Sequence, residues 1–292
     1  MRIKMNAECL VCHLKRNVEL AQRLGDDETA TAFAKEMMKL YLSAPENVSS
    51  PYFAPGTEML LQRFYGLGED RYLAEKEASN RYVLERLDMI RQRVMTAQDP
   101  VLAGLKFAIL GNYIDFSALR NEVSFEQLDD MLSSALDMEL EEASYRAFCE
   151  DLQSGEKLLY ITDNAGEIGF DRVLAEAIAQ NYPHLQILFC VRGGPAVNDA
   201  TRADAAAVGI PFAVMDNGTC LPGTELSCVS RETLEALENA DVILSKGQGN
   251  AETLLGSGYN VYYAFLVKCS RFIQKFGKPK FTPMFLRERD DA

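Results

Sequence analysis

The sequence of 292 residues contains no run of 18 or more apolar residues. Because a helix needs about 20 such residues to cross a bilayer, no membrane span is predicted. The N-terminal stretch also lacks the apolar core of a signal peptide, since Lys15 and Arg16 follow too soon. We therefore expect a cytoplasmic protein that has no membrane partner.

Positive charge is scarce as well: 30 Lys and Arg residues stand against 43 Asp and Glu residues, a net charge of −13. A general nucleic-acid binder needs a basic face, so no nucleic-acid partner is expected. The seven cysteines are odd in number and scattered, which favours a reduced compartment over a disulfide framework. No feature of the sequence fixes the oligomeric state.

Histidine occurs only twice, as His13 and His184, and neither follows an expected strand. A histidine-rich catalytic zinc site and a Ser-His-Asp triad are therefore poorly supported. A Walker A loop is absent too. The remaining candidates for chemistry are carboxylate, amide and lysine side chains.

The first half of the chain has the apolar periodicity of helices. Helices are expected over 10–24, 28–42, 101–111 and 124–152, with a turn-rich loop over 47–58. Between them, one long helix that ends at Asp99-Pro100 is expected to carry four apolar residues on one face, namely Val83, Leu87, Ile90 and Val94.

The pattern changes near residue 155, where short apolar runs begin to alternate with helical stretches. The expected strands are 157–162, 185–191, 211–215, 241–245 and 261–265. Alternation of this kind predicts an α/β protein with a mostly parallel sheet and helices on its faces. We divide the chain into a helical N-terminal region, 1–152, and an α/β domain, 153–292.

Nearly every expected strand is followed by oxygen ligands, a cation or a glycine loop. We call the segment that directly follows a strand its exit. In chain order the exits are Asp163, Asn164 and Glu167; Arg192 to Asp199; Asp216 to Thr219; Lys246 to Asn250; and Lys268 with Cys269. Because ligands of open parallel sheets bind at the carboxyl ends of the strands, these side chains are expected to meet.

The residue types at these exits favour a hard divalent cation and a phosphate. Asp and Asn oxygens suit Mg²⁺ or Mn²⁺, and a metal with few carboxylate ligands can share its coordination with phosphate. Lys246 and Lys268 are suitable point charges for that phosphate. Backbone N–H groups of the KGQGN loop could face it at the start of a helix over 250–255.

Each of these features also has a simpler interpretation. Asp163-Asn164 could cap the helix that follows the first strand. Glu167 could orient a water or ligand, or could only place favourable charge on the first turn of that helix. An exposed lysine is usually a solvated charge. The combination of exits is much harder to explain in this way than any single one.

Taken together, the motifs resemble the DUF89 family of ARMT1-like, metal-dependent damage-control phosphatases. The resemblance covers most of the chain, and its motifs are ITDNAGE, VNDATRAD, SKGQGN, the C-terminal LVKC and LGNYIDFS at 110–117. The N-terminal CLVC resembles the archaeal and bacterial branch. The resemblance implies a helical N-terminal part packed on a Rossmann-like, mostly parallel α/β domain.

The resemblance also implies roles for individual residues. A divalent metal, which is Mn²⁺, Co²⁺, Ni²⁺ or Mg²⁺ in this family, would be held by the catalytic residues Asp163, Asn164 and Asp199. The substrate-binding residues would be Lys246, Gly247 and Asn250 of one loop, Lys268 at the phosphate, and Asn112 and Asp115 from the helical part. Glu167 is predicted to bind substrate with them. The expected partner is a small phosphorylated metabolite.

Two departures bear on the substrate. Animal and fungal members carry Arg-Thr-x-Lys near the last strand, where this chain has Phe265-Leu266-Val267-Lys268. The pantothenate-kinase-linked branch carries Glu-Gly-Met-Gly-Arg where this chain has the loop from Lys246 to Asn250. The sugar-phosphate preference of the first branch is therefore in doubt here, and phosphopantetheine is not favoured.

Cys9 and Cys12 form a CxxC pair that opens a helix, which makes thioredoxin-like redox catalysis a poor interpretation. With Cys269 they could bind a second metal, or they could pack as small hydrophobes, which we favour. Cys149, Cys190, Cys220 and Cys228 are also expected to pack.

The predicted function is metal-dependent hydrolysis of small phosphate esters by an activated water. Two alternatives remain open. One is an S-adenosylmethionine-dependent carboxyl methyltransferase, although DNAGE is not the glycine-rich loop that such a cofactor favours. The other is a metal- or metabolite-binding protein without catalytic activity.

Overall fold

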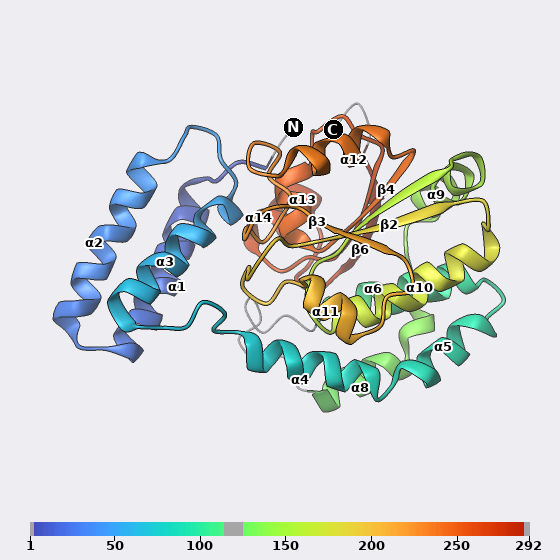
Figure 1. Cartoon of the computed structure of the whole chain (residues 1–292), viewed down its shortest axis with the longest axis horizontal. Coiled ribbons are helices and arrows are strands. Elements are labelled where there is room, and N and C mark those ends of the chain that lie inside the picture. Colours follow the sequence, from blue (N-terminus) through green and yellow to red (C-terminus); the bar gives the residue numbers. More distant parts are fainter. Residues whose placement is uncertain (1–2, 114–124, 289–292) are drawn as a thin grey trace.

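The computed structural model describes residues 3–113 and 125–288. Its strands are β1 (Lys157–Ile161), β2 (Gln186–Val191), β3 (Ala213–Asp216), β4 (Val242–Lys246), β5 (Val261–Leu266) and β6 (Pro283–Arg287). In this part of the chain they form one sheet in the order β3-β2-β1-β4-β5-β6 (Figure 1). The first five strands are parallel, and β6 is antiparallel to β5. The predicted α/β class with a mostly parallel sheet is confirmed.

All five expected strands are present within a few residues of their predicted bounds. Strands β4 and β5 are buried along their whole length, which is why they read as continuous apolar runs. The sixth strand, β6, was not predicted. It begins with Pro283 and lies at the sheet edge, where a proline is tolerated and where apolar alternation is weak.

The helices surround this sheet and precede it. In the first half their bounds are α1 (Ala7–Leu24), α2 (Asp27–Ser43), α3 (Ala54–Tyr65), α4 (Leu73–Leu84), α5 (Leu87–Met95), α6 (Pro100–Gly111), α8 (Phe125–Ser133) and α9 (Glu142–Ser154). In the second half they are α10 (Glu167–Asn181), α11 (Arg202–Ala207), α12 (Arg231–Asn239), α13 (Gln248–Leu254) and α14 (Ser270–Phe276). Short 3-10 helices are η1 (Ser50–Phe53) and η2 (Ala135–Asp137).

Two predictions about the helices were wrong. The supposed loop over 47–58 contains η1 and the start of α3. Its prolines lie in the first turn of these two helices, where the backbone N–H that proline lacks would have no partner within the helix. The supposed single long helix is split into α4 and α5. The amide of Arg86 bonds to the carbonyl of Val83, a tighter turn than an α-helix makes, yet the four predicted apolar residues still share one buried cluster.

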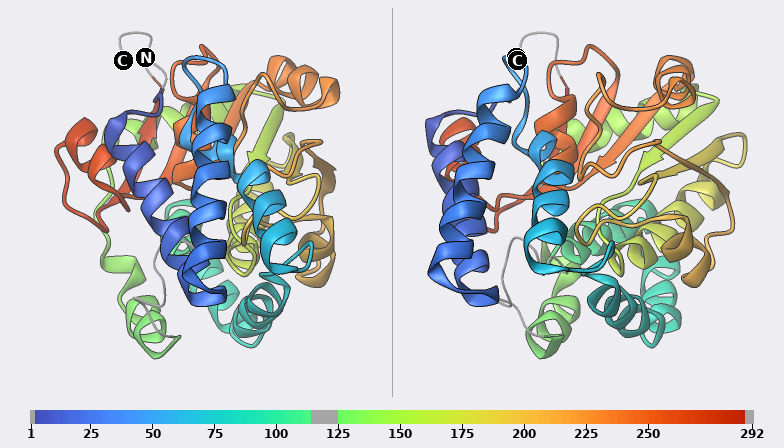
Figure 2. Two further views of the ribbon diagram at one scale, coloured as in Figure 1. Left: turned by 90° about the vertical axis from the view of Figure 1, so that its left-hand side faces the viewer. Right: turned by 60° about the vertical axis from the view of Figure 1, so that its left-hand side comes forward.

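Helices α1, α2 and α3 form a lobe beside the rest of the chain, on the left of Figure 1 and facing the viewer in the left view of Figure 2. This lobe has a small core of its own around Phe33, Met37 and Leu61. Its sharp helix starts follow from capping, since the Asn6 and Asp26 side chains accept backbone N–H bonds in the first turns of α1 and α2.

The sheet carries helices on both faces. One face packs against α6, α9 and α10, and the other packs against α12, α13 and α14. Helices α4, α5 and α8 form an outer layer on α6 and α10. Residues 100–111 and 142–154 thus contribute directly to the core of the sheet, and the division of the chain at residue 152 stays a prediction. No helix within the described ranges has both the length and the apolar character to span a membrane.

Candidate metal and phosphate site

The strand order reverses at the centre of the sheet, because β2 lies on one side of β1 and β4 lies on the other. A crevice outside the carboxyl ends of the strands is the usual ligand site of such sheets. The loop after β1 carries Asp163 and Asn164, and the loop after β4 carries Gly247. The topology therefore places the two most distinctive motifs of the sequence at the switch point.

Backbone bonds join the loop after β1 to the loop after β2. Asn164 and Asp199 form an isolated antiparallel bridge. The amide of Ala200 donates to the carbonyl of Asp163 at 2.7 Å, and the amide of Ala165 donates to that of Asn198 at 2.9 Å. The two loops that carry the three candidate metal ligands are thus held side by side by the main chain.

Amide side chains fix the carboxylate of Asp163. Its Oδ2 accepts from Nδ2 of Asn112 and from Nδ2 of Asn164, each at 2.8 Å. The Oδ1 of Asn164 accepts from Nδ2 of Asn198 at 2.8 Å. Asn112, at the end of α6, therefore reaches the site from the helical half of the chain.

Glu167 and Lys246 form a fully buried ion pair behind these groups. The Nζ of Lys246 donates to Oε1 of Glu167 and to Oδ1 of Asp171 at 2.7 Å, and to the carbonyl of Ala108 at 2.9 Å. Oε2 of Glu167 accepts from Asn112 and Asn164. The two carboxylates hold the pKa of Lys246 above its ordinary value against the opposing effect of burial, and burial raises the pKa of Asp171 to about 6.

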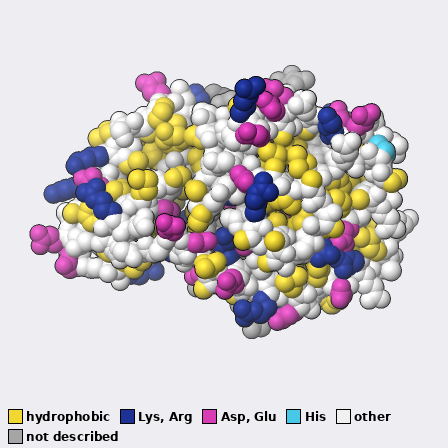
Figure 3. All heavy atoms as spheres, viewed as in Figure 1, with side chains coloured by type: hydrophobic (Ala, Val, Ile, Leu, Met, Phe, Trp, Pro, Cys, Tyr) yellow, Lys and Arg dark blue, Asp and Glu magenta, His cyan; other side chains and the backbone are white. Residues whose placement is uncertain are grey.

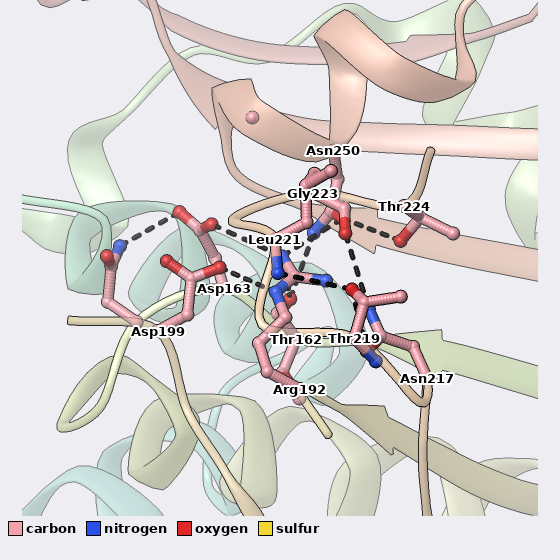
Figure 4. A network of polar contacts seen from close by, with 12 residues as sticks. Thr162, Asp163, Arg192, Asp199, Asn217, Thr219, Leu221, Gly223, Thr224 and Asn250 are labelled. Carbon is pink, nitrogen blue, oxygen red and sulfur yellow. Dashed lines mark hydrogen bonds and ion pairs between the residues drawn. The ribbon is translucent and has the colours of Figure 1, made fainter. Parts of the chain in front are cut away.

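A second buried cation, Arg192, lies on the other side of the site (Figure 4). Its Nε donates to Oδ2 of Asp199 at 2.6 Å, and its Nη2 donates to Oδ1 of Asn250 at 3.1 Å. From the sequence, Arg192 was expected only as part of a strand exit, with no role assigned. Its role depends on partners that are distant in the chain, so no local signal marks it.

The site has the electrostatics of a cation site. At the site, four buried carboxylates, Asp163, Glu167, Asp171 and Asp199, stand against two buried cations, Lys246 and Arg192, a formal charge of −2. Lys268 adds one positive charge near Asp163 from the cavity wall. Burial first, and then Asp199 and Glu167, raise the pKa of Asp163 well above its ordinary value. A bound divalent cation would offset the negative charge of the site and lower the pKa of Asp163.

Gly247 provides room at Asp163. It has φ of +80°, and a β-carbon there would lie 1.9 Å from Oδ2 of Asp163. Only glycine can occupy this position without displacing the carboxylate. Two carboxylates, one amide and a glycine that leaves space beside them are a donor set that fits a hard divalent metal.

A cavity of about 620 Å³ opens between the α1–α3 lobe and the α/β body. Asp163, Asn164, Asp199 and Lys268 line it at the sheet. The opposite wall comes from α1, η1 and α3, and it includes His13 and Arg16. Side chains of both charge signs lie along the junction of lobe and body in Figure 3.

Comparison with known proteins identifies the family. Residues 5–282 match the model of the damage-control phosphatase ARMT1-like domain. The chain belongs to this family. A damage-control phosphatase of Pyrococcus horikoshii is 30% identical, with 98% of this chain and 99% of that protein covered. A damage-control phosphatase of Archaeoglobus fulgidus is 31% identical, over 94% and 96% of the two chains.

A solved structure agrees with this assignment. The crystal structure of a DUF89 family protein from Pyrococcus horikoshii superposes with a TM-score of 0.82 at 29% identity, and the match covers 98% of this chain and 99% of that one. The predicted resemblance is confirmed. The chain is a phosphatase, a hydrolase of phosphate esters, and its family implies a divalent metal.

The structure places the predicted site residues in two groups. Asp163, Asn164, Asp199 and Lys268 line the cavity. Asn112, Glu167, Lys246 and Asn250 are fully buried behind it and bond to the first group or to each other. Gly247 lies between the groups, and Asp115 falls outside the described residues.

The cysteines behave differently from the prediction. All seven are free. Cys9, Cys12 and Cys269 line the cavity, and Cys12 is exposed, so the packing interpretation is wrong for Cys12. Cys220 and Cys228 are exposed as well, whereas Cys190 is buried as expected. Within the described ranges, no group of three or more His, Cys, Asp or Glu residues is arranged to hold a metal; the candidate site has two such residues, Asp163 and Asp199, and its third candidate ligand is the amide of Asn164.

Proposed function

We propose that the chain hydrolyses small phosphorylated metabolites with Mn²⁺, Mg²⁺, Co²⁺ or Ni²⁺ bound by Asp163, Asn164 and Asp199. The observation that carries this proposal is the buried pair of Asp163 and Asp199, which faces a cavity and belongs to a cluster with a formal charge of −2. The two buried cations of this cluster are shared among four carboxylates. A divalent cation supplies the missing charge.

When bound, such an ion polarises a phosphoryl oxygen and favours ionisation of a water next to the phosphorus. Asp163 and Asp199 are held ready by Asn112 and Arg192, so little reorganisation is needed. Lys268 lines the same cavity and would offset the charge of the transferred phosphoryl group. The water oxygen bonds to phosphorus and gives up a proton to solvent, the ester P–O bond breaks, and the alkoxide oxygen takes up a proton from solvent and leaves as the alcohol.

We assign supporting roles to the buried residues. Lys246 donates to Glu167 and fixes its carboxylate, which in turn accepts from the side-chain amides of Asn112 and Asn164 and orients them. Asn250 spans from the carbonyl of Thr162 to Arg192 and so ties the KGQGN loop to the loop after β1. These residues would bind substrate only indirectly, by shaping the site.

The substrates we propose are small. A cavity of about 620 Å³ lies within the range of roughly 300–1,000 Å³ that is typical of metabolite-sized ligands. Its wall mixes acids, cations and thiols, which suits a polar phosphate ester better than a long apolar one. A cytoplasmic location and the absence of a nucleic-acid partner remain our predictions from composition.

Phosphate release tests the function. Metal-stripped protein is incubated with p-nitrophenyl phosphate and a panel of sugar and cofactor phosphates, with each of the four metals restored. We expect release that requires added metal and is lost in Asp163→Asn. Asp216→Asn is a matched control, because Asp216 is paired with Arg202 on the surface. Release that persists in metal-free protein would refute the proposed mechanism.

Phosphate release and calorimetry together distinguish the phosphatase from the two alternatives. Folded, metal-bound protein that releases no phosphate from any ester would favour a binding protein. Binding of S-adenosylmethionine in calorimetry without metal would favour the methyltransferase. No observation among the described residues supports either of these over the phosphatase.

A further inference from the structure

Arg192 is among the largest fully buried side chains of the described structure, with 1% of its surface exposed. An arginine is rarely buried unless its charge and donors are satisfied, because desolvation of the guanidinium is costly. Its Nε and Nη2 have hydrogen-bond partners, whereas its Nη1 has none among the described residues, so the partners of Nε and Nη2 indicate what the side chain does. Those partners are two candidate metal ligands and two groups of the neighbouring loops.

The guanidinium bridges segments that follow three different strands, namely the loops after β1 and β2 and the first turn of α13 after β4. Nε donates to Oδ2 of Asp199 at 2.6 Å, and Nη2 donates to Oδ1 of Asn250 at 3.1 Å and to the carbonyl of Thr162 at 3.4 Å. Nη2 also lies 4.0 Å from Oδ1 of Asp163. Figure 4 shows Arg192 between Asp199 on one side and Asn250 on the other.

The backbone of Arg192 is fixed independently of its side chain. Its amide donates to the carbonyl of Ala200 at 2.9 Å, and the residue forms a parallel bridge with Thr201. The next residue, Gly193, donates to the carbonyl of Thr219 and to Oδ1 of Asn217. The side chain therefore extends from a rigid base toward the Asp199 carboxylate.

Arg192 does not line the cavity, in contrast to Lys268, Asp163 and Asp199. It is thus placed to act on the ligands and not on the substrate. We propose that Arg192 is a positioning residue that fixes the orientation of the Asp199 carboxylate toward the metal and ties it to Asn250 and the KGQGN loop. This inference rests on the metal site of the proposed function.

The loss of Arg192 has two opposite expected effects on metal affinity, one from its charge and one from its hydrogen bonds. Removal of a cation near a dication site relieves repulsion, so electrostatics alone would tighten metal binding. Loss of the bond that orients a ligand carboxylate weakens metal binding by about tenfold to a hundredfold. Arg192→Lys separates the two, because it keeps the charge but its single nitrogen cannot reproduce the bonds to both Asp199 and Asn250.

The test is the Mn²⁺ dissociation constant, measured from the electron paramagnetic resonance signal of free Mn²⁺ with folded protein. We expect Arg192→Lys to raise the dissociation constant about tenfold or more. Arg202→Lys is the matched control, since Nε of Arg202 bonds to Oδ2 of Asp216 at the same 2.6 Å away from the site. Thr224→Val removes only the other donor to Asn250 and should change the constant less than Arg192→Lys does.

Two readouts separate positioning from a general structural role. A partly unfolded variant would bind fewer Mn²⁺ ions with unchanged affinity, whereas a mispositioned ligand lowers affinity at full stoichiometry. A mispositioned ligand also allows phosphatase activity to recover partly as Mn²⁺ is raised to saturation. Arg192→Gln, which keeps a donor but no charge, replaces the lysine variant if that variant does not fold.

The outcomes are distinct for the two proposals. Wild-type protein that neither binds Mn²⁺ nor releases phosphate overturns the proposed function and this inference with it. Wild-type protein that does both, with a dissociation constant for folded Arg192→Lys equal to or tighter than the wild-type value, overturns the positioning role alone. Weaker binding at unchanged stoichiometry supports it.

Discussion

A β-carbon on Gly247 would lie 1.9 Å from Oδ2 and 2.1 Å from Cγ of Asp163. No rotation of a side chain at position 247 can remove this overlap, because the β-carbon is fixed by the backbone. The positive φ of +80° adds a second reason for glycine. Glycine is thus required at position 247, after β4, by the carboxylate of Asp163, which follows β1.

Gly247→Ala should therefore displace Asp163 and lower phosphatase activity by about a hundredfold, the effect expected from a misplacement near 1 Å. Strain at the positive φ should also lower the free energy of unfolding by about 1–3 kcal/mol. Activity is measured at saturating metal, and stability by urea denaturation. Gly258→Ala is the control, since Gly258 has φ of +84° but no atom within 4 Å of an added β-carbon. Equal activity losses in both variants would contradict the steric explanation.

The buried ion pair of Lys246 and Glu167 leads to a prediction about stability. Lys246→Met leaves Glu167 and Asp171 without their cation in a place where both are inaccessible to water. Removal of one partner from a buried pair typically costs about 3–5 kcal/mol. We expect a loss of this size in the free energy of unfolding, measured by chemical denaturation.

Lys39→Met provides a matched control for that measurement. Lys39 is 2.6 Å from Glu36, as close as Lys246 is to its partners, but its side chain is 72% exposed. An exposed pair contributes little to stability because solvent screens it, so this variant should be nearly as stable as the wild type. If Lys246→Met lowered the free energy of unfolding no more than Lys39→Met does, burial of the pair would not contribute to stability.

Much of the site could be predicted because a polar residue directly after a buried apolar strand is well placed to bind a ligand. Parallel strands bring their exits to one edge, so Asp163, Asn164, Asp199 and Gly247 were placed together from their order alone. The α/β class followed from the same alternation. The edge strand β6 and the split between α4 and α5 did not, since both depend on local contacts that weaken the periodic pattern.

The roles of the cations could not be predicted. In the sequence, Lys246 is a polar residue at the end of a strand and is most simply a solvated charge. Its burial depends on Asp171 and on the carbonyl of Ala108, which come from two helices distant in the chain. The role of Arg192 depends in the same way on the loops after β1 and β2 and on the first turn of α13 after β4. Tertiary contacts of this kind leave no local trace.

His13 should make the stability of the protein depend on pH. Burial in the α1–α3 lobe lowers the pKa of His13 to about 4, from an ordinary value of 6.5, and Nδ1 lies 2.7 Å from the Tyr41 hydroxyl. The unfolded chain binds a proton at this residue below pH 6.5, but the folded chain does not until about pH 4. Stability is therefore present above pH 6.5 and is lost as pH falls from about 6.5 toward 4.

The size of that loss is at most about 3.5 kcal/mol, because the two pKa values differ by about 2.5 units and one unit corresponds to roughly 1.4 kcal/mol. Urea denaturation of wild type and His13→Gln between pH 7 and pH 4 measures it, and the variant should show a shallower decline. His184→Gln removes the other histidine, keeps His13, and should retain the decline that His13 causes. An identical pH profile for wild type and His13→Gln would disprove the assignment.

Gln248 anchors the last part of the site. Its Oε1 accepts from the backbone amide of Lys268 at 2.9 Å, and its Nε2 donates to Oε1 of Glu252 and to Sγ of Cys269. The start of α13 thereby holds the loop after β5, from which Lys268 lines the cavity. Gln248→Leu removes all three bonds and should release Lys268 from its position at the phosphate.

We expect Gln248→Leu to raise KM about tenfold with a smaller change in kcat, because a typical hydrogen bond contributes about 0.5–1.5 kcal/mol. A double-mutant cycle with Lys268→Met identifies the route of the effect. If Gln248 acts through Lys268, the double variant has nearly the kcat/KM of Lys268→Met alone, since nothing remains to be positioned. Fully additive losses in kcat/KM would mean that Gln248 contacts the substrate itself, and its bond to the Lys268 amide would then be incidental to catalysis.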